Sequence, residues 1–191
     1  MIAALFVQRD GVYFGIPDVD PWDEERDARL YAGPFPVVAH PPCARWCRLA
    51  ALVESTGGAK RGDDGGCFAA ALASVRAWGG VLEHPAWSEA WPAFGLTKPR
   101  ARGWQRTMDG GFVASVDQGA YGHLAPKATW LYAFGVAVTP LRTSRPKARM
   151  VVTTSRRQRG HMPEMPKSQR SRTPLEFRDV LLDMARAAGQ A

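Results

Sequence analysis

Short apolar runs alternate along the chain with stretches in which apolar residues recur at helical spacing. The runs have the length of buried strands and are bounded by glycine, proline or aspartate, which commonly occupy turns. They predict extended segments at residues 1–7, 12–16, 35–40, 81–85, 111–122 and 129–138.

Helix signals lie between these runs. Asp20 as N-cap and Pro21 at the first helical position, followed by acidic residues, predict a helix that starts there. Residues 64–78 place apolar side chains on one face and end at a glycine pair, which predicts a second helix. A brief amphipathic helix or turn is expected over 87–95.

Strands that alternate with helices predict an α/β fold with a mainly parallel sheet in a single compact domain. A capping-box signature of Thr173, Pro174 and Glu176 precedes a last amphipathic helix. The expected organisation is an α/β core over residues 1–141, a basic loop region over 142–172 and a C-terminal helix over 173–191 that packs on the core.

The composition is that of an ordinary globular protein, with 46% apolar and 23% charged residues. No apolar run approaches the roughly 18 residues of a membrane span, and the N-terminus lacks the features of a signal peptide. We therefore expect a soluble, cytoplasmic protein with no membrane contact, and the sequence assigns no oligomeric state. The three cysteines, Cys43, Cys47 and Cys67, are expected to be reduced thiols.

Positive charge is concentrated in one part of the chain. The net charge is +7, yet residues 142–172 alone carry ten Lys or Arg and one acid, Glu164. Such a segment attracts polyanions through phosphate contacts, so DNA is the expected partner, and the alternative is a solvated flexible tail. The residues assigned to nucleic-acid binding are Arg142, Arg145, Lys147, Arg149, Arg156, Arg157 and Arg159.

Two of the predicted strands end in reactive side chains. Cys43 follows the run 35–40, and Glu83 lies in the run 81–85. Because ligands bind at the carboxyl ends of parallel strands, both side chains are expected at one edge of the sheet. A helical pattern after Cys43 would favour its thiolate, whereas the alternative is a small buried apolar side chain.

Three motifs in order, "HPPC", "VLEHP" and "YGHLAPKATWLYAFG", resemble the cytosine-C5 DNA methyltransferase family, and most closely short phage-type proteins related to it. The closing "KSQRSRTPLEFRDVLLDMARAA" is also similar to the C-terminal segment of those phage-type proteins. The resemblance implies a Rossmann-like, methyltransferase-type sheet, a target base flipped out of DNA, and S-adenosylmethionine as methyl donor. Cys43 matches the nucleophile of the family and Glu83 its acid.

The expected reaction is transfer of a methyl or other one-carbon group to C5 of cytosine or a related pyrimidine. The thiolate adds at C6 while the carboxyl group acts near N3. Lys127 and Thr129 stand where the family has two arginines, His84 stands where it usually has asparagine, and Trp46 is expected to stack on the base. The residues assigned to the substrate are Pro41, Pro42, Trp46, His84, Lys127 and Thr129.

The chain departs from the family at the donor site, because no Phe-x-Gly-x-Gly turn follows the first strand. Asp18 or Asp20 is assigned to the ribose of the donor, and the alternative for either is a turn cap.

Three other interpretations stay open. In the first, the chain is a degenerate family member that binds DNA without catalysis. In the second, it is a pyrimidine-modifying enzyme that uses another donor or takes a free nucleotide as substrate. A zinc site built from His40, Cys43 and Cys47, with Cys67 or His84, is the third, although its spacing is not a familiar one.

Overall fold

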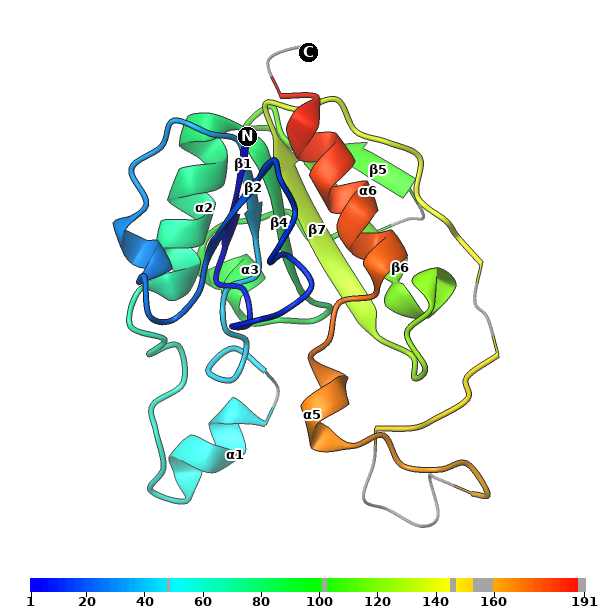
Figure 1. The fold of residues 1–191 in the computed structure, drawn as a ribbon. Coiled ribbons are helices and arrows are strands. Elements are labelled where there is room, and N and C mark those ends of the chain that lie inside the picture. The colour runs from blue at the N-terminus through cyan, green and yellow to red at the C-terminus, as the bar shows by residue number, and fades with distance from the viewer. Residues whose placement is uncertain (48, 101–102, 145–146, 153–159, 189–191) are drawn as a thin grey trace.

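The computed structural model describes residues 1–47, 49–100, 103–144, 147–152 and 160–188, which form a single mixed α/β domain (Figure 1). Within this part of the chain, seven strands make one sheet in the order β2-β1-β3-β4-β7-β6-β5. The strands are β1 (Ile2–Leu5), β2 (Val19–Trp22), β3 (Val37–Ala39), β4 (Gly80–Pro85), β5 (Gly103–Arg106), β6 (Phe112–Asp117) and β7 (Ala128–Phe134).

The sheet has a parallel and an antiparallel half. β2, β1, β3 and β4 are mutually parallel, as expected from the sequence. β7 is antiparallel to β4, β6 to β7 and β5 to β6. The segments of β6 and β7 were predicted as two strands around a Gly-containing turn, whereas β5 and the antiparallel pairing of β7 with β4 were not predicted. The parallel strands β1 and β3 are buried along their whole length, because helices cover both faces of the sheet.

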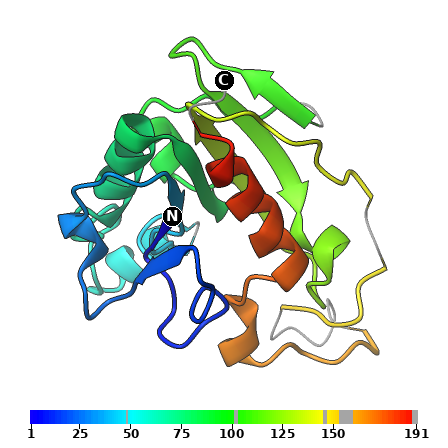
Figure 2. The same ribbon diagram turned by 45° about the horizontal axis from the view of Figure 1, so that its top comes forward.

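Helices form a layer on each face of the sheet. α2 contacts β3, β4 and β7, whereas α6 contacts β1, β3 and β4 from the other side (Figures 1 and 2). The helical elements of the described chain are η1 (Ala28–Leu30), α1 (Ala50–Ser55), α2 (Cys67–Trp78), α3 (Ala90–Ala93), η2 (Gln118–Tyr121), α5 (Lys167–Arg170) and α6 (Leu175–Arg186). None of them is long and apolar enough to cross a membrane.

The predicted helix over 64–78 is confirmed as α2. Its predicted apolar face, Phe68, Leu72 and Val75, lies in the hydrophobic core between helix and sheet. Full burial of one such side chain stabilises a fold by about 1.5–3 kcal/mol. The C-terminal helix is confirmed as α6, and the residues that it buries in the second core are Phe177, Leu181, Leu182, Met184 and Ala185.

The helix predicted to start at Asp20 and Pro21 is wrong, because residues 19–22 form the edge strand β2 instead. Ile2 and Val7 donate backbone hydrogen bonds to the carbonyls of Asp18, just before this strand, and Trp22, its last residue, at 2.9 and 3.2 Å. Proline is tolerated in an edge strand. Pairing with β1 therefore overrides the local helix signal.

Two further expectations are corrected. Residues 12–16 form turns and not a strand. The capping box is not formed among the described residues: α6 starts after Pro174 without a side-chain cap, and Glu176 pairs with Arg142.

The topology places one edge of the sheet where loops from several strands meet. The chain leaves β1 toward β2 on one side and reaches β3 on the other, so a crevice is expected between the carboxyl ends of β1 and β3. The antiparallel β7 begins at this same edge. α1 and α5 extend beyond it, at the lower end of the molecule in Figure 1.

Gly80 tests the packing of β4 against β3. Its φ is +136°, and a Cβ there would overlap the carbonyl oxygen of Val37 on the neighbouring strand. We expect Gly80→Ala to lower the free energy of unfolding by roughly 3 kcal/mol or more, since the strands must separate. Gly57→Ala is the control. Its φ is +80°, but a Cβ there would have no atom within 4 Å outside the adjoining residues, so we expect a loss of only about 1 kcal/mol in the free energy of unfolding. Equal losses in urea denaturation would contradict this account.

Candidate active site

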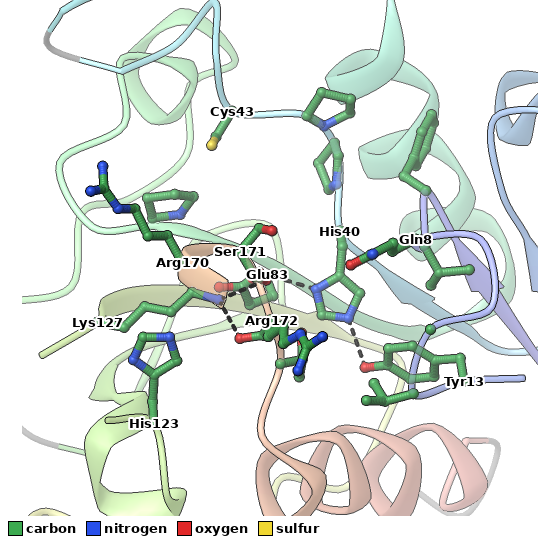
Figure 3. A pocket seen from close by; sticks show the side chains of 18 of the residues that line it. Gln8, Tyr13, His40, Cys43, Glu83, His123, Lys127, Arg170, Ser171 and Arg172 are labelled. Atoms are coloured by element: carbon green, nitrogen blue, oxygen red, sulfur yellow. Dashed lines mark hydrogen bonds and ion pairs between the residues drawn. The ribbon is translucent and has the colours of Figure 1, made fainter. Parts of the chain in front are cut away.

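A cavity of ≈ 1110 Å³ opens at the carboxyl edge of the parallel strands. Its walls come from the loop after β1, the turn after β3, the end of β4, the segment before β7 and residues 170–173. Cys43, Glu83 and Lys127 all line it, and Figure 3 shows them with side chains from these different elements. Three residues singled out from the sequence are thus brought together.

Cys43 is exposed and lies in a turn, with α1 beginning at Ala50. The expectation that a helix starts at Cys43 and favours its thiolate is therefore wrong. Desolvation of the sulfur and the negative charge of Glu83 raise the pKa of Cys43 above its ordinary value. The resting side chain is a thiol that must lose its proton before it can act as a nucleophile.

Glu83 is buried in β4 and has a hydrogen-bond donor on each oxygen. Nδ1 of His40 lies 3.0 Å from its Oε2, and Nε2 of Gln118 donates to its Oε1 at 2.9 Å. Burial alone would raise the pKa of Glu83, but the hydrogen bond and charge of His40, with the charge of Lys127, lower it to about 2. The carboxyl group is therefore ionised at rest.

Lys127 reaches the cavity from the segment before β7. Its Nζ donates to the backbone carbonyls of Ser171 and Arg172 at 3.2 and 3.1 Å, so it fixes the chain between α5 and α6 as one wall. Desolvation lowers the pKa of Lys127, although the charges of Glu83 and Cys43 oppose this shift.

The remaining residues assigned to the substrate divide into two groups. Pro41 and Pro42 line the cavity. His84 is fully buried against Phe68 and Trp91, outside the described lining, and burial lowers its pKa to about 4.

Thr129 is also fully buried outside the described lining. Its Oγ1 accepts a hydrogen bond from Gln118 at 3.0 Å, so it positions a partner of Glu83 and does not reach the base site.

Trp46 does not form the aromatic wall that the sequence suggested. It is buried, donates from Nε1 to Asp64 at 2.8 Å and packs against Phe68 and Phe94. Trp87 lines the cavity instead, with 62% of its surface exposed and a left-handed φ of 62°.

The two acids assigned to the donor are paired elsewhere. Asp18 lies at the amino end of β2 and forms an ion pair with Arg186 at 2.8 Å. Asp20 accepts hydrogen bonds from Arg26 and from Nε1 of Trp22. Neither is among the described residues that line the cavity, so these acids do not fit a donor bound there.

The predicted basic set is described in part. Arg142 pairs with Glu176 and lies 5.0 Å above the ring of Tyr121. Lys147 and Arg149 are exposed. Arg145, Arg156, Arg157 and Arg159 lie outside the described residues. Two arginines that the sequence analysis did not assign, Arg170 and Arg172, line the cavity.

Sequence reasoning missed the residues that surround Glu83. His40 was considered only as a zinc ligand, although it directly follows β3 and precedes the proline pair. Tyr13 lies in a loop mistaken for a strand, and its hydroxyl is 2.7 Å from Nε2 of His40. The described residues gather no group of three or more His, Cys, Asp or Glu that could hold a metal ion, so the zinc set is not assembled among them.

Comparison with known proteins adds no relative. No protein-family model matches the chain, no curated protein matches it in sequence and no solved structure matches its fold.

The coupling of Cys43 to Glu83 is directly testable. After desolvation, the negative charge of Glu83 is the next cause that raises the pKa of Cys43. Glu83→Gln removes this charge, so more thiolate forms and alkylation of Cys43 by iodoacetamide at pH 7.5 should accelerate. Peptide mass spectrometry separates the three cysteines.

The control is Asp64→Asn. The charge of Asp64, after burial, raises the pKa of Cys67, so this variant should accelerate alkylation of Cys67 and leave Cys43 unchanged. Equal Cys43 rates in wild type and Glu83→Gln would show that the two side chains are not coupled.

Proposed function

We propose that the protein modifies cytosine, or a related pyrimidine, in DNA at C5 through a covalent adduct with Cys43. One observation carries the proposal: the thiol of Cys43 and the carboxyl group of Glu83, 40 positions apart in sequence, line one cavity at the ends of neighbouring parallel strands. The sequence resemblance to cytosine-C5 methyltransferases assigns chemistry to the same two residues.

The chemistry explains why these groups belong together. C5 of cytosine is a weak nucleophile until a group adds at C6, and the thiolate of Cys43 is the nucleophile of the cavity suited to that addition. Glu83 faces the N3 edge of the ring, where protonation stabilises the adduct. The resulting enamine attacks an electrophilic carbon at C5, after which the C5 proton and the thiolate leave.

Nucleic acid is the substrate that the charge distribution favours. Lys147, Arg149 and Arg172 are exposed, and Arg170 and Arg172 stand at the cavity wall. Cationic side chains in this arrangement bind a phosphate backbone. A base inside a duplex cannot reach the end of a cavity, so the target nucleotide is flipped out or single-stranded.

S-adenosylmethionine is the donor that the resemblance implies. Because Asp18 and Asp20 are paired with arginines, we assign no residue to it and derive no step through it. The loop after β1 lines the cavity from Phe6 to Tyr13 and contains two non-glycine residues with left-handed backbone, Phe6 and Asp10. Such strain is concentrated at binding sites, and this loop is part of the cavity wall.

Covalent trapping tests the proposal. Oligonucleotides that carry 5-fluorocytosine, single-stranded and duplex, are incubated with the protein with and without S-adenosylmethionine. Fluorine at C5 blocks the final elimination, so we expect a covalent complex by intact mass in wild type and none in Cys43→Ala.

The arms of this experiment separate the alternatives. A Cys43-dependent complex that requires S-adenosylmethionine supports methyl transfer. A complex with 5-fluoro-deoxycytidine monophosphate alone points to a free nucleotide as substrate. DNA binding without any complex would contradict catalysis and leave a binding protein.

Trp87 provides a second prediction. It lines both the main cavity and a smaller neighbouring one that contains Lys98, and its indole lies 6.3 Å from that of Trp130. A base stacked on Trp87 contributes about 1–3 kcal/mol, so Trp87→Ala should weaken binding of a single-stranded oligonucleotide by roughly tenfold or more in fluorescence anisotropy. Met108→Ala, at a fully exposed turn, is the control, and equal affinities of the two variants would exclude stacking.

A further inference from the structure

The surroundings of Glu83 create a chemical requirement. Both carboxylate oxygens accept hydrogen bonds, one from His40 and one from Gln118, and the side chain is only 9% exposed. This arrangement holds the carboxylate as an anion. An anion cannot donate to N3 of cytosine, which is a hydrogen-bond acceptor, so Glu83 must first receive a proton.

His40 is placed to supply that proton. It lines the cavity, and its side chain is 13% exposed, so the ring exchanges protons with solvent yet contacts Glu83 directly. Gln118 is an amide and has no proton to give at neutral pH. The ammonium of Lys127 donates to two backbone carbonyls and, among the described residues, forms no hydrogen bond or ion pair with Glu83.

Tyr13 holds the imidazole in both of its charge states. Its hydroxyl, 2.7 Å from Nε2 of His40, donates to a neutral ring and accepts from a protonated one. In either case Nδ1 carries hydrogen toward Glu83. Burial raises the pKa of Tyr13 well above its ordinary value, so its hydroxyl stays neutral.

Other ionisable groups surround the hydrogen-bonded series of Tyr13, His40 and Glu83. The turn after β3 contributes Cys43, β4 contributes His84, the segment before β7 contributes Lys127, and α6 contributes Arg178 and Asp179. Asp10, from the same loop as Tyr13, also lines the cavity, as do His123, Arg170 and Arg172.

We propose that Tyr13 and His40 form the path by which Glu83 acquires the proton that it passes to N3 of the target base. The inference rests on the proposed function and assigns His40 as a positioning residue that acts through Glu83.

The step balances without any further reagent. The electron pair of the Cys43 thiolate forms the S–C6 bond, the C5=C6 electrons move to C4=C5, and the C4=N3 electrons take the proton of Glu83. Glu83 has received that proton from Nδ1 of the His40 imidazolium, and the ring becomes neutral with its hydrogen on Nε2, from which it donates to the hydroxyl oxygen of Tyr13. The proton of the Cys43 thiol leaves to solvent through the open cavity, and solvent later restores the imidazolium.

Exchange of the C5 hydrogen of the target cytosine with solvent deuterium measures this step, because the adduct with Cys43 forms and reverses without a methyl donor. Wild type should show a limb of its pH–rate profile that requires a titratable ring at position 40. His40→Asn keeps an N–H near Glu83 but cannot titrate, so exchange should fall by roughly 100-fold or more and the limb should disappear. His161→Asn, at an exposed histidine outside the cavity, should retain the limb.

Tyr13→Phe removes one oxygen and is the second variant if His40→Asn does not fold. It should displace the limb, because the imidazole loses its partner at Nε2. If the limb of the pH–rate profile is unchanged in either variant, the inference is overturned. Exchange of the C5 hydrogen by wild type in the same experiment upholds the proposed function. Absence of exchange and of adduct in wild type contradicts both.

NMR of protein labelled with ¹⁵N-histidine tests the geometry without substrate. We expect the neutral His40 ring to carry hydrogen on Nδ1, and its signals to change in Glu83→Gln. Hydrogen on Nε2 of the neutral ring in the resting protein, before any transfer to Glu83, would overturn the assigned path even in an active enzyme.

Discussion

The register between β3 and β4 is the constraint on which the site depends. Ala39 pairs with Leu82, so the next residues along the two parallel strands, His40 and Glu83, stand side by side at the end of the sheet. Both strands are buried, and a shift by one residue would turn Glu83 to the other face. Gly80 permits this register, because any side chain there would meet the backbone of β3.

From that register follow the electrostatics of the cavity. His40 and Gln118 keep Glu83 ionised, and the anion in turn keeps Cys43 protonated. The thiol of Cys43 therefore stays protonated in the resting protein even though the residue is exposed. In the proposed reaction, transfer of the His40 proton to Glu83 removes the negative charge that opposes ionisation of Cys43. Protonation of Glu83 therefore prepares both the proton donor for the pyrimidine and the nucleophile.

Much of the fold could be predicted, and the failures have physical reasons. α2 and α6 follow from apolar periodicity. Cys43 follows from its position after one buried strand, and Glu83 from its position near the end of another. The segment at Asp20 has helix signals but completes the sheet edge, a long-range pairing that local propensity does not encode. Trp46 is close to Cys43 in sequence, yet its indole turns into the core. The roles of His40 and Tyr13 depend on contacts across 43 and 27 positions.

The central claim is that the cavity holds a pyrimidine between Cys43 and Glu83. A crystal structure of the Cys43→Ser variant with a cytosine-containing oligonucleotide tests it most directly. We predict a flipped or single-stranded base in the cavity, with C6 facing residue 43 and N3 within hydrogen-bond distance of Glu83. Bound DNA whose bases all lie outside the cavity, or an N3 edge turned away from Glu83, would contradict the account.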